Sequence, residues 1–360
     1  MKSDFTVYIG TYTRRDSEGI YVYKIDLNSG KLSYSSKVTG IENPSFLVTD
    51  SKFKTLYAIS EIDKFEGEAT GIVVSYSISS DTGNLTYLNK RLSQGTIPCH
   101  LQVNETDEYL LLANYGSGSV ASFPIMKDGS LDNVSSFIQH QGSSINPERQ
   151  LGPHAHSINL DSKNQFAFSP DLGTDKIMSY KFDSKNGKLT ANDISPYVKT
   201  QPGAGPRHFD FHPTKNFAYA INELDSTITA FIYNSDKGTL KPIQTITTLP
   251  DDCTTNTSCA DIHVSPDGKF VYGSNRGHDS IARFAVDEKT GYLTPLGHTP
   301  TQGAIPRNFA IDPTGQFMLV ANQDSDTVIT FKIDPKAGDL IDINQIASVP
   351  MPVCIKFAPI

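Results

Sequence analysis

Cysteine is scarce in this chain. Only four of the 360 residues are cysteines, at positions Cys99, Cys253, Cys259 and Cys354. Cys253 and Cys259 are six positions apart, and no Cys-x-x-Cys pair or second ligand cluster accompanies them. Disulfide frameworks and zinc sites both depend on paired spacings that this set does not contain. We therefore expect reduced thiols and no metal site.

Long apolar segments are also missing. No apolar run approaches the roughly 20 residues that a membrane-spanning helix needs. The opening stretch Met1–Phe5 is polar and lacks the apolar core of a secretory signal. We expect a cytoplasmic protein that does not associate with membranes.

Positive charge is in deficit, because the formal net charge is −8. Nucleic-acid-binding surfaces are normally basic, so we expect no nucleic-acid partner. The chain contains no Gly-x-Ser-x-Gly nucleophile elbow. It contains neither a P-loop nor a dinucleotide-binding glycine motif. These absences argue against a serine hydrolase with a nucleophile elbow and against a nucleotide-binding protein. The sequence also shows no helical periodicity of useful length.

The chain does contain one unit that is repeated along its whole length, which is the first pattern to look for in a sequence. In the clearest copy, Phe209 and Phe211 alternate with polar residues, as in a half-buried strand. A turn over 212–216 follows, and the apolar run Phe217–Ile221 predicts a buried second strand. A third strand comes next, and then a Gly-x-Leu turn that we expect to open a fourth strand. The seven turn glycines are Gly30, Gly83, Gly129, Gly187, Gly238, Gly291 and Gly338.

The two ends of the chain decide the architecture. After Pro352 only one first strand remains, whereas Thr6–Tyr12 is a second strand. Third and fourth strands follow at Gly19–Asp26 and Lys31–Lys37. The C-terminal strand therefore completes the blade that the N-terminus begins. This predicts an all-β fold, a closed seven-bladed β-propeller with four-stranded antiparallel blades.

We interpret residues 1–360 as a single propeller domain, with the last blade shared between segments 1–40 and 350–360. Two separate β-sandwich domains would need a linker, and the sequence contains none. The longest irregular stretch, Gln139–Leu151, lies inside a repeat, and we interpret it as an insertion on a blade connection.

Arg207 precedes the first strand of the clearest copy and Glu223 follows the second. A hairpin would place both at the same rim. The Arg207-equivalent positions of the seven repeats hold Ser45, Cys99, His156, Arg207, Ala260, Arg307 and Val353. The Glu223-equivalent positions hold Tyr12, Glu61, Tyr115, Leu172, Glu223, Arg276 and Gln323. A purely structural role would favour small or uniform residues, but these positions diverge and several carry charge.

The charged members would meet at one mouth of the central channel. They are His156, Arg207, Arg276, Arg307, Glu61 and Glu223. A local positive cluster on an acidic protein indicates a small anionic ligand, and guanidinium groups suit phosphate and carboxylate. A plainer interpretation stays open, with Arg207 and Glu223 as a structural salt bridge and His156 as a hydrogen-bonded rim residue. His154 is an alternative to His156.

Several motifs resemble those of the seven-bladed β-propeller 6-phosphogluconolactonase family, and the resemblance covers essentially the whole chain. They are Gly205–His208, Asn222–Ser226, Ala260–His263 with Pro266–Gly268, Pro306–Arg307 and the opening Tyr8–Tyr12. The same fold family includes fungal carboxy-cis,cis-muconate cyclase, whose proposed active residues are a histidine, two arginines and a glutamate. By motif these resemble His156, Arg207, Arg276 and Glu223.

The resemblance implies lactone chemistry, and we expect a carboxylic ester hydrolase of the pentose phosphate pathway. Its substrate would be 6-phospho-D-glucono-1,5-lactone and its product 6-phosphogluconate, with no cofactor and no metal. Arg207 or Arg276 would stabilise the oxyanion. His156 or Glu223 would take a proton from the attacking water.

We expect Arg307 to bind the phosphate, and His208, Glu61 and Tyr115 to be further substrate-binding residues. His208, like His212 and His263, lies on or beside a first strand and is also interpreted as a structural hydrogen-bonding group. The alternatives are a muconate-type lactonising cycloisomerase, another sugar lactonase, or a non-enzymatic interaction scaffold. We expect a monomer or a weak homodimer.

Overall fold

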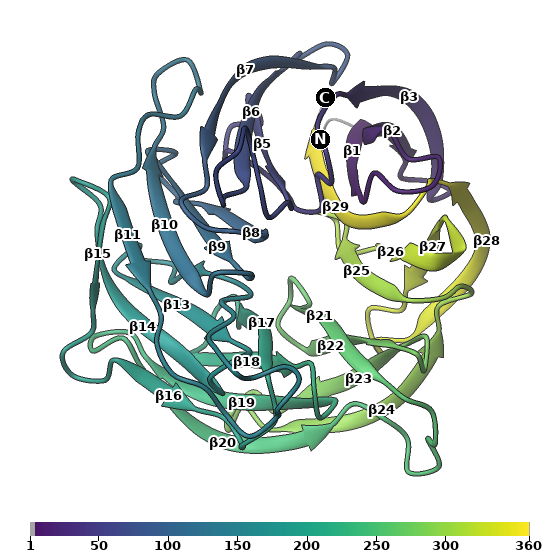
Figure 1. The fold of residues 1–360 in the computed structure, drawn as a ribbon. Coiled ribbons are helices and arrows are strands. Elements are labelled where there is room, and N and C mark those ends of the chain that lie inside the picture. Colours follow the sequence, from purple (N-terminus) through teal and green to yellow (C-terminus); the bar gives the residue numbers. More distant parts are fainter. Residues whose placement is uncertain (1–3, 360) are drawn as a thin grey trace.

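The computed structural model describes residues 4–359, whose strands form seven sheets around one centre (Figure 1). Each sheet is one blade of a propeller. The first blade contains β29 (Pro352–Pro359), β1 (Asp4–Thr11), β2 (Gly19–Asp26) and β3 (Lys31–Thr39). The second blade contains β4 (Leu47–Thr49), β5 (Thr55–Ser60), β6 (Ile72–Ile78) and β7 (Leu85–Leu92).

The other blades follow in chain order. The third contains β8 (Pro98–Val103), β9 (Tyr109–Asn114), β10 (Ser119–Pro124) and β11 (Ser136–Gln139). The fourth contains β12 (Asn159–Leu160), β13 (Phe166–Asp171), β14 (Lys176–Asp183), β15 (Lys188–Ala191) and β16 (Tyr197–Lys199). The fifth contains β17 (Pro206–Phe211), β18 (Phe217–Asn222), β19 (Thr227–Asn234) and β20 (Thr239–Thr247).

The last two blades repeat the same order. The sixth contains β21 (Ser258–Val264), β22 (Phe270–Arg276), β23 (Ser280–Val286) and β24 (Leu293–Pro300). The seventh contains β25 (Pro306–Ile311), β26 (Phe317–Asn322), β27 (Thr327–Ile333) and β28 (Leu340–Ser348). Within the described residues the one helical segment is the short 3-10 turn η1 (Gln323–Ser325), and no described helix has the length and hydropathy of a membrane span.

Closure of the ring is confirmed. β29 pairs with β1 in an antiparallel register that places Val7 opposite Phe357 and Tyr8 opposite Lys356. In Figure 1 the yellow C-terminal strand lies beside the purple N-terminal strand. This pairing removes the exposed edge that β1 would otherwise present.

The repeated Gly-x-Leu turn joins neighbouring blades. At Gly238, where φ is +61°, an added Cβ would lie 2.1 Å from the Phe166 ring of the preceding blade. Buried tyrosines complete the same contact, since the Tyr219 hydroxyl donates to the Gly291 carbonyl at 3.1 Å. Glycine is required because its left-handed backbone and its missing side chain let the turn reach the next blade.

The expected fourth strand is wrong at one blade. β11 begins at Ser136 and not directly after Gly129. The Leu131 N–H donates to Asn89 Oδ1 at 3.0 Å, and the Leu131 carbonyl accepts from Asn89 Nδ2 at 2.8 Å. Leu131 also forms an isolated bridge with Ile125, so the regular ladder of this blade starts later in the chain. The expected insertion is confirmed, because residues 140–158 join β11 to β12 without forming a strand.

Candidate active site

A β-bulge positions the Arg207-equivalent side chains. In the β17–β18 hairpin, Pro206 pairs with Asn222 and His208 pairs with Ile221, so Arg207 is the extra residue. The same irregularity occurs at Cys99 and at Arg307. A bulge re-aims the extra side chain out of the regular alternation. Three blades therefore present a side chain to the channel from one equivalent position.

The structure brings most of these positions together. Six of the seven line one small cavity on the channel axis, and they are Ser45, Cys99, His156, Arg207, Arg307 and Val353. The seventh, Ala260, contributes its carbonyl, which accepts from Arg207 Nη1 at 2.5 Å. The Glu223-equivalent Glu61 lines the same cavity.

Glu223 is the centre of the charged cluster. Its Oε2 lies 2.9 Å from Arg207 Nε and 3.0 Å from Arg276 Nη2. Its Oε1 accepts from Arg149 Nη2 at 2.7 Å. Burial opposes ionisation of this carboxyl group, but attraction to the three arginines outweighs it and lowers the pKa of Glu223. Glu223 is therefore ionised and is a weak base.

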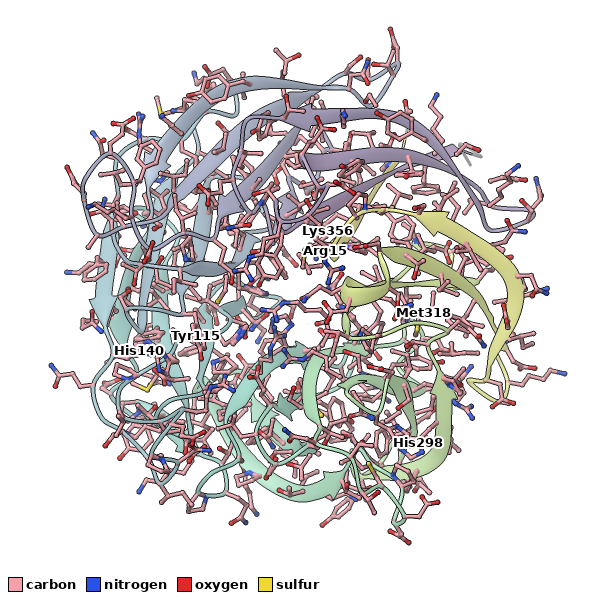
Figure 2. The ribbon with its side chains drawn as sticks, turned by 45° about the vertical axis from the view of Figure 1, so that its right-hand side comes forward. Arg15, Tyr115, His140, His298, Met318 and Lys356 are labelled. Atoms are coloured by element: carbon pink, nitrogen blue, oxygen red, sulfur yellow. The ribbon has the colours of Figure 1, made fainter. Side chains whose placement is uncertain are left out.

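Arg149 is a contact that the repeat pattern does not predict. It comes from the insertion, and its Nη2 also donates to the Tyr115 hydroxyl at 3.1 Å. His140 anchors the start of the insertion, with its Nδ1 2.6 Å from Asp171 Oδ2. Figure 2 shows Tyr115 and His140 on the same side of the ring. The available sequence signal was that Arg149 is the single arginine of segment 140–158.

Backbone carbonyl groups also hold the side chains of Arg207 and Arg276 in place. Arg276 Nη2 donates to the Cys259 carbonyl at 2.7 Å. Burial, followed by repulsion from Arg307 and Arg276, lowers the pKa of Arg207 to about 10. Its guanidinium therefore keeps its charge near neutral pH, and hydrogen bonds to backbone carbonyls hold both side chains in fixed positions.

His156 is buried beside the cluster. Its Nδ1 lies 3.6 Å from Cys99 Sγ, and its ring is 5.2 Å from the Tyr115 ring in an edge-on contact. Burial and then Arg207 lower the pKa of His156 well below 6.5, so the imidazole is neutral. His154 stacks on Tyr115 at 4.5 Å, with its Nδ1 2.9 Å from the Tyr115 carbonyl. Both candidate histidines therefore contact one tyrosine.

His208 contacts the guanidinium group of Arg207. Its Nε2 is 3.2 Å from Arg207 Nη1 and its Nδ1 is 2.6 Å from Asp261 Oδ1. Asp261 Oδ2 is 3.1 Å from His263 Nε2. Burial and then Arg207 lower the pKa of His208 to about 4. A neutral His208 that donates to Asp261 can accept from Arg207, and this holds the arginine in position.

A wider pocket of about 480 Å³ opens outside the axial cavity. Its lining includes Tyr12, Arg14, Glu61, Arg307 and Gln323. The Tyr12 hydroxyl donates to Glu61 Oε1 at 2.9 Å, and the Ser45 hydroxyl donates to Oε2 of the same carboxylate. The wider pocket shares Glu61 and Arg307 with the axial cavity and is more open to solvent.

Arg307 lines both the axial cavity and the wider pocket. Its guanidinium carbon lies 5.3 Å from the centre of the Tyr12 ring. Burial opposes its charge, but Tyr12 and Glu61 outweigh burial and raise the pKa of Arg307. Within residues 4–359 its guanidinium makes no hydrogen bond or ion pair, and it contacts the Tyr12 ring. This half-buried cation is therefore available to a ligand.

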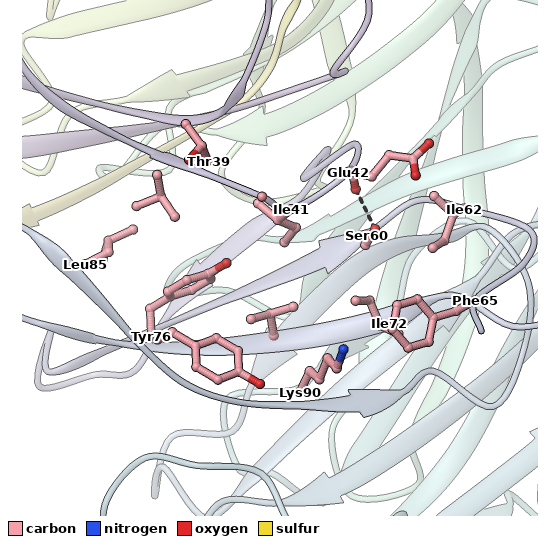
Figure 3. A pocket seen from close by; sticks show the side chains of 14 residues that line it. Thr39, Ile41, Glu42, Ser60, Ile62, Phe65, Ile72, Tyr76, Leu85 and Lys90 are labelled. Carbon is pink, nitrogen blue, oxygen red and sulfur yellow. Dashed lines mark hydrogen bonds between the residues drawn. The ribbon is translucent and has the colours of Figure 1, made fainter.

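A different pocket, of about 520 Å³, lies between the first and second blades (Figure 3). Its lining is mainly apolar, with Ile41, Phe65, Ile72 and Leu85 among the side chains. Its cation, Lys90, lies 4.4 Å from the Phe65 ring centre and 3.5 Å from Glu66 Oε1. It lacks the arginines and the histidine of the channel mouth, so the candidate site stays at the mouth. In the described part of the chain no group of three or more His, Cys, Asp or Glu side chains is arranged to hold a metal ion.

Known proteins resemble the chain along its full length. The family model described as "Lactonase, 7-bladed beta-propeller" matches residues 6–357. The 6-phosphogluconolactonase of Bacillus subtilis is 39% identical over 97% of each chain. The protein of the same name from Formosa agariphila is 34% identical over 85% of this chain and 86% of its own.

A solved structure agrees with these sequence relatives. The periplasmic gluconolactonase of Pseudomonas aeruginosa matches with a TM-score of 0.93 and 33% identity, over 99% of this chain and 100% of its own. The fold, the family model and the relatives all lead to one assignment. The chain belongs to the seven-bladed β-propeller lactonase family.

Proposed function

We propose that this protein hydrolyses 6-phospho-D-glucono-1,5-lactone to 6-phosphogluconate, a reaction of the pentose phosphate pathway, at the mouth of its central channel. The proposal rests on the family assignment and on two relatives named 6-phosphogluconolactonase. The observation that carries it is the available guanidinium of Arg307 beside the Arg207–Glu223–Arg276 cluster. A half-buried cation without an ion-pair partner leaves its positive charge for a ligand, so this arrangement suits an anionic substrate.

The chemistry is acyl transfer to water. The water oxygen attacks the lactone carbonyl carbon, and negative charge develops on the carbonyl oxygen. Arg207 and Arg276 supply fixed donors for that charge, because Glu223 and backbone carbonyls already hold both side chains. The bond between the carbonyl carbon and the ring oxygen then breaks, and the ring oxygen leaves as a hydroxyl group.

His156 is the proposed base. It takes a proton from the attacking water and returns a proton to the ring oxygen. A neutral imidazole has the free lone pair that this transfer needs, and the lowered pKa of His156 keeps it neutral. Glu223 is a weaker candidate because three arginines lower its pKa. We assign Glu223 to holding the arginines, and His154 remains the alternative base.

Residues of both the axial cavity and the wider pocket bind the substrate in this proposal. Arg307 binds the phosphate, and Glu61 and Tyr115 accept or donate hydrogen bonds to the sugar hydroxyls. His208 contributes by holding Arg207. We further propose that residues 1–360 act as one domain, because the site draws on side chains from blades at both ends of the chain.

The test is a coupled assay with freshly prepared 6-phosphogluconolactone, in which a dehydrogenase consumes the product. Arg207→Ala and Arg276→Ala should each lower kcat by about 10²–10³-fold, the usual cost of one lost oxyanion donor. Arg307→Ala should mainly raise KM. Melting temperatures of the same variants separate catalytic loss from unfolding. Stably folded variants with wild-type kinetics would remove the mouth as the active site.

A further inference from the structure

Two arginines of the wider pocket contact one aromatic ring. The guanidinium carbon of Arg307 is 5.3 Å from the centre of the Tyr12 ring, and that of Arg14 is 5.5 Å away. Both arginines line the same pocket. Attraction between a cation and the face of an aromatic ring keeps each guanidinium against Tyr12. Both planar donor groups therefore belong to the lining of one pocket.

Neither arginine is paired within the described residues. In residues 4–359 the side chains of Arg14 and Arg307 make no hydrogen bond or ion pair, and each contacts the Tyr12 ring. The neighbouring Arg15 is different, because its guanidinium lies 3.7 Å from Asp324 Oδ1 and 3.2 Å from Asp326 Oδ1. The loop after β1 thus fixes one arginine to the seventh blade and leaves the other for the pocket.

The pocket has two chemically different sides. The first and seventh blades supply the arginines and Tyr12, whereas the second blade and the connection before it supply Glu42, Glu61 and Asp63. Ionised carboxylates only accept hydrogen bonds, so they fit sugar hydroxyls. Guanidinium groups fit the oxygens of a phosphate. A sugar phosphate has both kinds of group, one at each end.

We infer that Arg14 and Arg307 form a two-arginine clamp beside Tyr12 that binds a phosphate monoester, and that Arg14 makes the site selective for phosphorylated over neutral sugar lactones. This inference rests on the proposed lactone hydrolysis. It adds a specificity residue, Arg14, that lies outside the equivalent positions of the repeat. A dianion carries two charges for the two guanidinium groups, whereas a neutral lactone leaves both unpaired.

The test compares two substrates, 6-phosphogluconolactone and the unphosphorylated glucono-1,5-lactone, on wild type, Arg14→Ala, Arg14→Lys and Arg15→Ala. Arg14→Ala should lower kcat/KM for the phosphorylated lactone by about 10–100-fold through KM, the usual worth of a hydrogen bond to a charged group. Its kcat/KM for the neutral lactone should stay within about twofold of wild type. Arg14→Lys should recover part of the loss, because phosphate also accepts a point charge.

Arg15→Ala is the matched control. It removes an adjacent arginine of the same loop, and both substrates should be hydrolysed as by wild type. Inorganic phosphate should inhibit the wild type competitively, and Arg14→Ala should weaken that inhibition by a similar factor to the change in KM.

Two results would overturn the clamp while leaving lactone hydrolysis intact. One is a wild-type enzyme with equal kcat/KM for the two lactones, and the other is an Arg14→Ala variant that loses both activities equally. If the wild type hydrolyses neither lactone, the proposed function fails and the clamp is decided by calorimetry with inorganic phosphate. Binding to the wild type but not to Arg14→Ala supports it, and equal or absent binding refutes it.

Discussion

Arg207 and Glu223 form an ion pair whose side chains are only 3% and 5% exposed, with 2.9 Å between Nε and Oε2. The pair closes one end of the β17–β18 hairpin. Removing one partner of a buried pair leaves an uncompensated charge in a poorly solvated place. The site therefore contributes to the stability of the fold as well as to chemistry.

Glu223→Gln should lower the free energy of unfolding by about 3–5 kcal/mol, because the arginines around it lose their counter-charge. The measurement is urea denaturation at neutral pH. Glu18→Gln is the control, since it removes an exposed partner of Lys37 and should cost about 1 kcal/mol or less. A Glu223→Gln variant as stable as the control would show that the cluster does not support the fold.

The same carboxylate predicts a pH dependence. Its pKa is lower in the folded protein than its ordinary value of 4.5, so its contribution is fully present above that value. The contribution is lost as pH falls from there toward the folded pKa. The stability difference between wild type and Glu223→Gln should be constant from neutral pH down to about pH 5 and should shrink at lower pH. A difference that grows with acidification would contradict this assignment.

Arg149→Ala should affect turnover more than folding. Its side chain is 39% exposed, and its contacts orient Glu223 and the Tyr115 hydroxyl. We expect an almost unchanged melting temperature and a loss of kcat on the phosphorylated lactone of up to about 10²-fold, the cost of misplacing catalytic groups. Glu148→Ala in the same loop is the control and should behave as wild type. Normal kinetics in Arg149→Ala would make the insertion a structural element only.

The pH profile of kcat/KM should lack an inflection near 6.5 that belongs to His156. Burial and then Arg207, His208 and Arg307 lower the pKa of that imidazole well below 6.5. Only the acid limb, well below pH 6.5, should report its protonation. The profile of kcat/KM is the appropriate measurement because it reports the pKa values of the free enzyme. An inflection of kcat/KM near pH 6.5 that is lost in His156→Gln would contradict the predicted neutral state.

Deletion of residues 352–360 should make the protein aggregate or lower its melting temperature strongly. The deletion removes β29 and exposes the edge of β1, and unpaired edges favour intermolecular strand pairing. Light scattering and thermal unfolding are the measurements. A circular permutant that joins the two ends through a flexible linker and opens the chain in the exposed 251–256 loop keeps every strand and should remain soluble. An unchanged melting temperature after the deletion would contradict closure by β29.

Much of the architecture follows from local sequence. Strand alternation, the seven Gly-x-Leu turns and the unmatched strand at each end are sufficient to predict a closed seven-bladed ring, since each depends on neighbouring residues and on the repeat. The same logic placed Arg207 opposite Glu223, because a hairpin brings its two outer ends together whatever surrounds it. The logic fails at one blade, where β11 begins at Ser136 and not directly after Gly129.

Only the tertiary structure decided which charges meet. Arg149 and Arg14 lie outside the equivalent positions of the repeat, so no periodicity indicates that they reach Glu223 and Tyr12. The protonation of His156, Arg207 and Glu223 also depends on burial and on charges contributed by other blades. Local sequence determines secondary structure and register because those interactions are short in range. Packing of the blades around the axis determines the site, because electrostatic interactions depend on distance in space and not on separation along the chain.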